Sequence, residues 1–119
     1  MATLTVETII KAGVQPVYSA VNSEDQFINP SNERTFLHVK NGGGGSINVT
    51  VVAQKTSAKV QGVGVVTIDN IVVAVPAADE RMIGPFSDAY TDSDGLVTVQ
   101  YSGTTSVTAQ AIKLAADSL

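Results

Sequence analysis

Hydrophobic and polar residues alternate along much of the chain with the two-residue period of β-strands. The clearest example is the segment 46–53, where every second residue from Ile47 is apolar while Ser46, Asn48 and Thr50 are polar. The segment 96–102 alternates in the same way. A slip of one residue would move a whole apolar row into solvent, so these strands are expected to have a well-defined register.

Short segments of this kind follow one another, separated by turns of Gly, Pro, Asn or Asp, and Val, Ile and Thr dominate them, as is typical of strands. The expected strands are 17–21, 26–29, 35–40, 46–53, 71–75, 81–86, 96–102 and 105–114, with a loop that contains a further strand within 54–70. The pattern predicts an all-β fold of about seven to nine short strands, either an antiparallel β-sandwich or a jelly roll. It does not choose between these two topologies.

The first 15 residues differ from the rest. Val6, Ile9 and Ile10 have the i, i+3, i+4 spacing of one face of a helix, and Gly13 is placed to end it. We therefore expect a short N-terminal helix or arm over 1–15, followed by a single β-sandwich domain over 16–119. A helix of two turns is not stable alone, so this segment must pack on its own sandwich or on a neighbouring subunit.

The segment 71–75 is apolar throughout. Such a run fits a strand that is covered on both faces, or one whose outer face is an interface. Together with the N-terminal segment, it supplies the residues that we expect at an interface with another protein, which are Leu4, Val6, Ile9, Ile10, Val72 and Ala74.

Composition narrows the class of protein. A chain of 119 residues fits one domain, and only 15% of its residues are charged, which leaves a surface rich in Thr, Ser, Asn and Gln. The net charge of -4 and the scattered Lys and Arg residues argue against nucleic acid as a partner. The absence of cysteine excludes disulfides and thiolate metal sites. Neither a secretory leader nor a membrane span is expected, because residues 1–7 lack a basic region and the apolar stretch 71–78 is too short.

Candidate catalytic chemistry is sparse. The single histidine, His38, lacks the Gly-x-Ser-x-Gly motif of a hydrolase, and the glycines at 42–45 lack the Lys and the helix of a phosphate-binding loop. Asp88, Asp92 and Asp94 lie close to Gly95, which fits an Asp-Gly turn or a loose calcium site, and the sequence leaves this open. We expect neither enzyme activity nor a cofactor, and we assign no residue as a metal ligand.

Four stretches resemble a known group of proteins. They are Leu-Thr-Val-Glu-Thr-Ile-Ile-Lys-Ala-Gly at 4–13, Arg-Thr-Phe-Leu-His-Val-Lys-Asn-Gly-Gly at 34–43, Val-Pro-Ala-Ala-Asp-Glu-Arg-Met-Ile-Gly-Pro-Phe at 75–86 and Asp-Gly-Leu-Val-Thr-Val-Gln-Tyr at 94–101. The chain resembles the small decoration (cement or auxiliary capsid) proteins of tailed bacteriophages that accompany an HK97-type major capsid protein. The resemblance implies a structural virion protein that is assembled in the host cytoplasm and binds the outer capsid surface, often as a trimer.

The function expected from this resemblance is to clamp neighbouring major capsid subunits from outside, so that the shell resists separation of its subunits. Several weak contacts made by one rigid body act together as a multivalent clamp. Two other functions stay open: a head-completion or tail structural protein, and a carbohydrate-binding or adhesion module on the virion surface.

Overall fold

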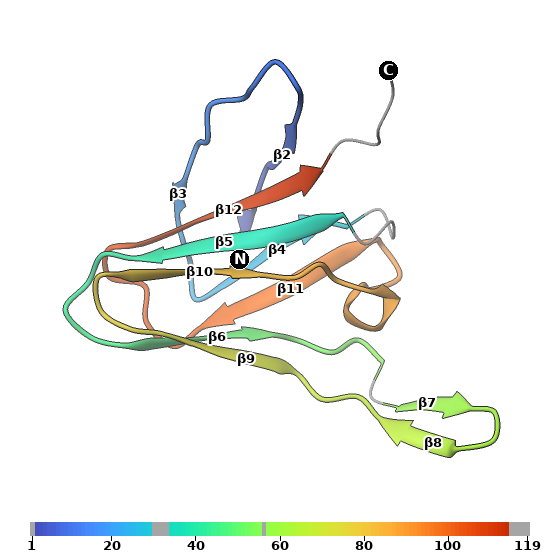
Figure 1. Cartoon of the computed structure of the whole chain (residues 1–119). Coiled ribbons are helices and arrows are strands. Elements are labelled where there is room, and N and C mark those ends of the chain that lie inside the picture. Colours follow the sequence, from blue (N-terminus) through green and yellow to red (C-terminus); the bar gives the residue numbers. More distant parts are fainter. Residues whose placement is uncertain (1, 30–33, 56, 115–119) are drawn as a thin grey trace.

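The computed structural model describes residues 2–29, 34–55 and 57–114, and it forms two β-sheets packed face to face with a hairpin projecting from one of them (Figure 1). Sheet A is the five-stranded sheet that contains the strands on either side of the hairpin in the sequence. In spatial order, its strands are β1 (Ala2–Thr3), β4 (Glu24–Ile28), β11 (Leu96–Tyr101), β6 (Ile47–Val51) and β9 (Ile71–Val75).

Sheet B covers one face of sheet A. In spatial order, its strands are β10 (Asp79–Ile83), β5 (Thr35–Asn41), β12 (Val107–Leu114) and β2 (Val6–Ile9), with β3 (Ser19–Ala20) also paired to β12. The strands β7 (Ser57–Val60) and β8 (Gly64–Thr67) form the hairpin, and a single 3-10 turn, η1, spans Asp88–Tyr90. The all-β, sandwich-like fold predicted from the alternation is therefore confirmed.

The core lies between the two sheets and is built from the predicted apolar rows. Val49 and Val51 of β6 and Leu37 and Val39 of β5 are completely buried. Phe27 of β4 packs against Phe86 of the loop after β10, with ring centroids 5.7 Å apart. The polar residues that alternate with these rows lie on the outer faces, as the two-residue period requires.

The N-terminal helix predicted from the spacing of Val6, Ile9 and Ile10 is wrong, because this segment is extended. β1 pairs in parallel with β4 in sheet A, and β2 pairs in parallel with β12 in sheet B. Leu4 lies between them and is buried in the core. A two-turn helix is marginal on its own, whereas two pairings with existing sheet edges satisfy the backbone and bury Leu4.

The two parallel pairings also correct the prediction of a purely antiparallel sandwich, because both sheets are mixed. The described residues form twelve strands rather than the seven to nine expected. The additional strands are the N-terminal pair and β7, which the sequence placed in a loop region. The segment expected at 81–86 begins earlier, at Asp79, and ends at Ile83, just before Gly84 and Pro85.

One buried side chain ties the two sheets together at one end of the sandwich. Asn41, at the end of β5, is 2% exposed, and its Nδ2 donates to the carbonyls of Gly45 (2.8 Å), Val75 (3.1 Å) and Pro76 (3.2 Å). Its Oδ1 accepts a hydrogen bond from the N–H of Gly43 at 3.0 Å. Asn41 of sheet B thus holds both the glycine loop and the turn that follows β9 of sheet A.

Replacing Asn41 by Ala should lower the free energy of unfolding by about 2–3 kcal/mol, because buried backbone groups lose their partner. Chemical denaturation followed by circular dichroism measures this. Asn48→Ala, on the exposed outer face of β6, is the matched control and should change stability by less than about 0.5 kcal/mol. Equal effects of the two substitutions would contradict the role given to Asn41.

Tyr101 is a second buried polar residue of the core, and its hydroxyl has no hydrogen-bond partner among the described residues. Burial, with a smaller effect of the Asp25 carboxylate, raises the pKa of Tyr101 well above its usual range. The tyrosine of the unfolded chain ionises near pH ~10 while that of the folded chain stays protonated. The unfolded state therefore binds fewer protons above that pH, and stability falls as the pH rises.

Tyr101→Phe should leave the free energy of unfolding at neutral pH unchanged or raise it by up to about 1 kcal/mol, because an unsatisfied hydroxyl is removed. The variant should also lose less stability than the parent chain above pH ~10. Denaturation curves at neutral and alkaline pH measure both effects. A variant that is less stable at neutral pH and keeps the full alkaline loss would contradict this interpretation.

Candidate interaction surfaces

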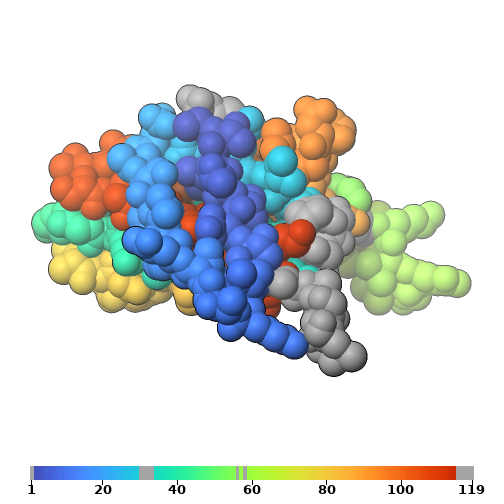
Figure 2. All heavy atoms as spheres, turned by 90° about the horizontal axis from the view of Figure 1, so that it is seen from above, coloured from blue at the N-terminus to red at the C-terminus, as the bar shows by residue number. Residues whose placement is uncertain are grey.

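The β7–β8 hairpin exposes apolar side chains on a projection from the body of the protein (Figures 1 and 2). Val63 in its turn is 72% exposed, and Val65 is 71% exposed; Val60 and Val66 are also exposed. A two-stranded hairpin is marginally stable in water on its own, and exposed apolar groups of this kind mark interaction sites. The hairpin is therefore a candidate contact surface.

A second apolar surface lies at the N-terminal end of the sandwich. The loop between β2 and β3, residues 10–18, rises above sheet B in Figure 1. We call it the N-terminal loop. Its exposed apolar side chains, together with those beside it, are Ile9, Ile10, Val14, Val17 and Leu114. Ile9 and Leu114 lie opposite each other in the β2–β12 pairing, so this surface continues from the loop onto the sheet.

The six residues predicted at an interface fall into three situations. Leu4 is buried in the core of its own chain, and Val6 is partly buried and packs against that core. Ile9 and Ile10 are exposed beside the N-terminal loop. Val72 and Ala74 are exposed on the outer face of β9, far from the other four in strand order. An interface role for the exposed four stays a prediction.

The position of β9 rules out one of the two interpretations of the apolar run 71–75, and the interface interpretation stays a prediction. β9 is the last strand of sheet A, and Val72 is 61% exposed. The strand is therefore not covered on both faces within the chain. Its outer face, which carries Val72 and Ala74, is exposed.

His38 takes part in a side-chain network that crosses sheet B. It is 7% exposed, its Nδ1 lies 2.6 Å from the Tyr18 hydroxyl, and its Nε2 lies 3.0 Å from Glu80 Oε1. In the neutral ring with the proton on Nε2, Tyr18 donates to Nδ1 and Nε2–H donates to the Glu80 carboxylate. The Lys40 ammonium lies 4.1 Å from the centre of the Tyr18 ring. Both ring nitrogens thus have structural partners, and the network attaches the chain just before β3 to β5 and β10.

The acidic loop before β11 is an Asp-Gly turn. Asp92 Oδ1 accepts hydrogen bonds from the N–H groups of Asp94 (2.8 Å) and Leu96 (2.9 Å), and Gly95 has a φ of +81°. Asp88 is in the separate 3-10 turn η1. Among the described residues, no three His, Asp or Glu side chains gather closely enough to hold a metal ion. The two hydrogen bonds give Asp92 a structural role in this turn.

The glycines after β5 have a packing role. The N–H of Gly42 donates to the carbonyl of Ser106, and the N–H of Gly43 donates to Asn41 Oδ1. A Cβ atom at Gly43 would lie 2.9 Å from the carbonyl oxygen of Thr105. These glycines let two turns approach closely, and both of these N–H groups are occupied.

The β7 strand is the surface element that sequence reasoning missed. Gly62 has a φ of +83° in the connecting turn, and the Val63 N–H donates to the Val60 carbonyl. Gly62 is thus the residue in the sequence that could have indicated this turn. The flanking residues do not show a two-residue pattern because none of the hairpin side chains that the structure describes is buried.

Comparison of the chain with models of protein families, with curated proteins and with solved structures finds no match. None of the described residues forms a helix long and apolar enough to cross a membrane. The surfaces described above therefore carry the functional argument, together with the resemblance of the four sequence stretches.

Tyr18→Phe should lower the free energy of unfolding by about 1 kcal/mol, because the buried Nδ1 of His38 loses its donor. Hydrogen exchange should also speed up at the amides of β3, since the network attaches this segment to the sheet. A double-mutant cycle with Glu80→Gln tests whether Tyr18 and Glu80 act through the same histidine. Strictly additive effects and unchanged exchange at β3 would contradict the proposed network.

Proposed function

We propose that this protein is a structural virion component that decorates the outer surface of a tailed-phage capsid and clamps neighbouring major capsid subunits. The observation that carries the proposal is the presence of two separate apolar projections on one sandwich. The N-terminal loop and the β7–β8 hairpin leave the body at different places and in different directions (Figure 1).

Two contact points on one body suit a clamp. Each projection is small, and its contact with a flat shell would be weak. Once the first projection is bound, the second binds at a high effective concentration, so the two contacts together hold far more tightly than either alone. The sandwich between them has a continuous core, and both projections are part of the same chain, so binding of one keeps the other near the shell.

The surface chemistry also favours a protein partner. Charged residues make up only 15% of the chain, and the outer face of sheet A carries the amide and hydroxyl side chains of Asn48, Thr50, Thr98 and Gln100. These groups cost less to bury against another protein than ions do. The net charge of -4 disfavours binding to the packaged nucleic acid.

The direct test is binding of the purified protein to heads that lack it, measured by co-sedimentation. Ile10→Asp in the N-terminal loop and Val63→Asp in the hairpin should each weaken binding by about tenfold or more, because each places a charge in an apolar contact. The double variant should bind far more weakly than either single variant, as loss of both contacts of a clamp requires.

Thr104→Asp, at an exposed position between β11 and β12 and away from both projections, is the control and should bind like the parent protein. Heads restored with the parent protein should withstand heating or chelation better than heads without it. Equal fragility of the two preparations, or binding that neither aspartate affects, would contradict the proposal.

A further inference from the structure

The outer edge of β9 is unusual among the sheet edges of the described chain. β9 pairs with β6 alone, from Ile71 opposite Val51 to Val75 opposite Ile47. Its other edge therefore presents backbone N–H and C=O groups that no strand of this chain pairs. Its five residues include no charge, proline or bulge of the kind that natural proteins place on free edges to prevent pairing.

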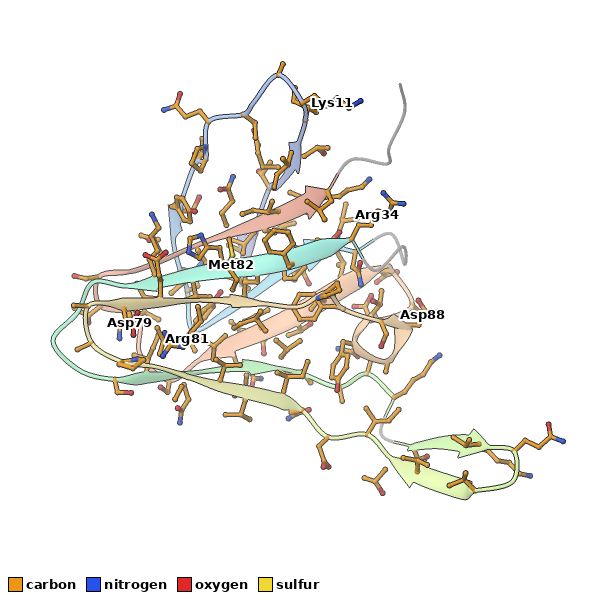
Figure 3. All side chains as sticks on the ribbon, viewed as in Figure 1. Lys11, Arg34, Asp79, Arg81, Met82 and Asp88 are labelled. Atoms are coloured by element: carbon orange, nitrogen blue, oxygen red, sulfur yellow. The ribbon has the colours of Figure 1, made fainter. Side chains whose placement is uncertain are left out.

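The neighbouring edge strand shows the opposite design. β10, which ends sheet B on the same side, carries Asp79, Glu80 and Arg81 among its five residues. Asp79 and Arg81 form an ion pair at 3.1 Å on the side of β10 that faces β9 (Figure 3). The N–H of Glu80 and the Arg81 guanidinium lower the pKa of the Asp79 carboxyl, so both charges are present at neutral pH. One edge is thus protected by charge and the adjacent edge is not.

The remaining edges are short or carry a charge. β1 and β3 have two residues each, β2 contains Glu7 and β7 contains Lys59. β8 has no charge, and it leads into β9 on the same side of the β6–β9 ribbon (Figure 1). From Gly64 to Val75 this edge includes one charged residue, Asp69. It is the longest nearly uncharged edge of the described residues.

We propose that a second copy of this chain pairs with β9 in antiparallel fashion about a two-fold axis, so that two copies of sheet A become one continuous ten-stranded sheet. Strand addition is driven by main-chain hydrogen bonds, and an identical strand supplies the same uncharged edge. Pairing all five residues centres the axis on Val73 and sets Val72 of each copy opposite Ala74 of the other. This also places an apolar side chain beside the exposed Val72 on the same face of the sheet.

The charges on either side of β9 are compatible with this arrangement. With the axis at Val73, Asp69 of one copy lies opposite Ala77 of the other, so no like charges meet. The hairpin, whose one charge is Lys59, is directed toward the turn of the other copy that leads to Asp79 and Glu80. The dimer has two-fold symmetry, whereas the resemblance to decoration proteins implies a trimer, and it does not depend on the proposed capsid function.

Sedimentation of the whole chain at increasing concentration, up to the millimolar range, tests the proposal. The parent chain should form dimers. The double variant Val72→Lys with Ala74→Lys should raise the dissociation constant of the dimer by about tenfold or more, because it sets lysines opposite each other across the axis. Both positions are exposed, so the variant is expected to fold, which circular dichroism verifies.

The matched control is Gln26→Lys with Gln100→Lys, which adds the same two charges to sheet A on its inner strands β4 and β11. This control should dimerise like the parent chain. Because the chain has no cysteine, a single Val73→Cys substitution gives a second readout. Its two sulfurs would meet at the axis, and mild oxidation should link the dimer covalently.

A chain that stays monomeric over the whole range would overturn the proposal. So would a trimer, or a dimer that tolerates the lysines at 72 and 74 and forms no disulfide at position 73. Any of these results would leave the capsid proposal standing, because head binding is tested with substitutions in the two projections, and these leave the β9 edge unchanged.

Discussion

The packing of two apolar sheet faces against each other is the interaction on which the rest of this structure depends. No strand of the described chain exceeds eight residues, and most have five or fewer, so none is stable without the opposite sheet. Burial of Val49 and Val51 against Leu37 and Val39 fixes the register of the central strands. The polar residues between them are thereby assigned to the outer faces.

This constraint also explains where the functional surfaces lie. The core between two small sheets takes one apolar row from each strand, and apolar residues beyond those rows must remain outside. Such residues lie in the N-terminal loop, in the β7–β8 hairpin and on the outer face of β9, and also singly at Ile28 and Met82. Exposed apolar groups are more typical of a protein that is covered by partners in an assembly than of one that acts alone.

Local pattern was sufficient for the elements that bury one face. The strands at 47–51 and 96–101 could be predicted because alternation reports burial of a single face. The N-terminal segment was misjudged because the spacing of Val6, Ile9 and Ile10 fits one face of a helix. In the strand β2 that it forms instead, Val6 and Ile9 lie on opposite faces, and the partner β12 is distant in sequence. Whether 71–75 was central or at an edge depends on sheet order, which no local pattern contains. The His38 network likewise joins residues 20 and 42 positions apart, so only the folded chain brings them together.

The proposed capsid function requires the protein to occupy regular positions on the shell. The measurement that tests it most directly is the ratio of this protein to the major capsid protein in purified particles, determined by quantitative mass spectrometry. The account predicts a simple ratio, such as one-to-one or one-to-three, with hundreds of copies on each head. A few copies per particle would assign the protein to the neck or tail, and its absence from particles would contradict the account.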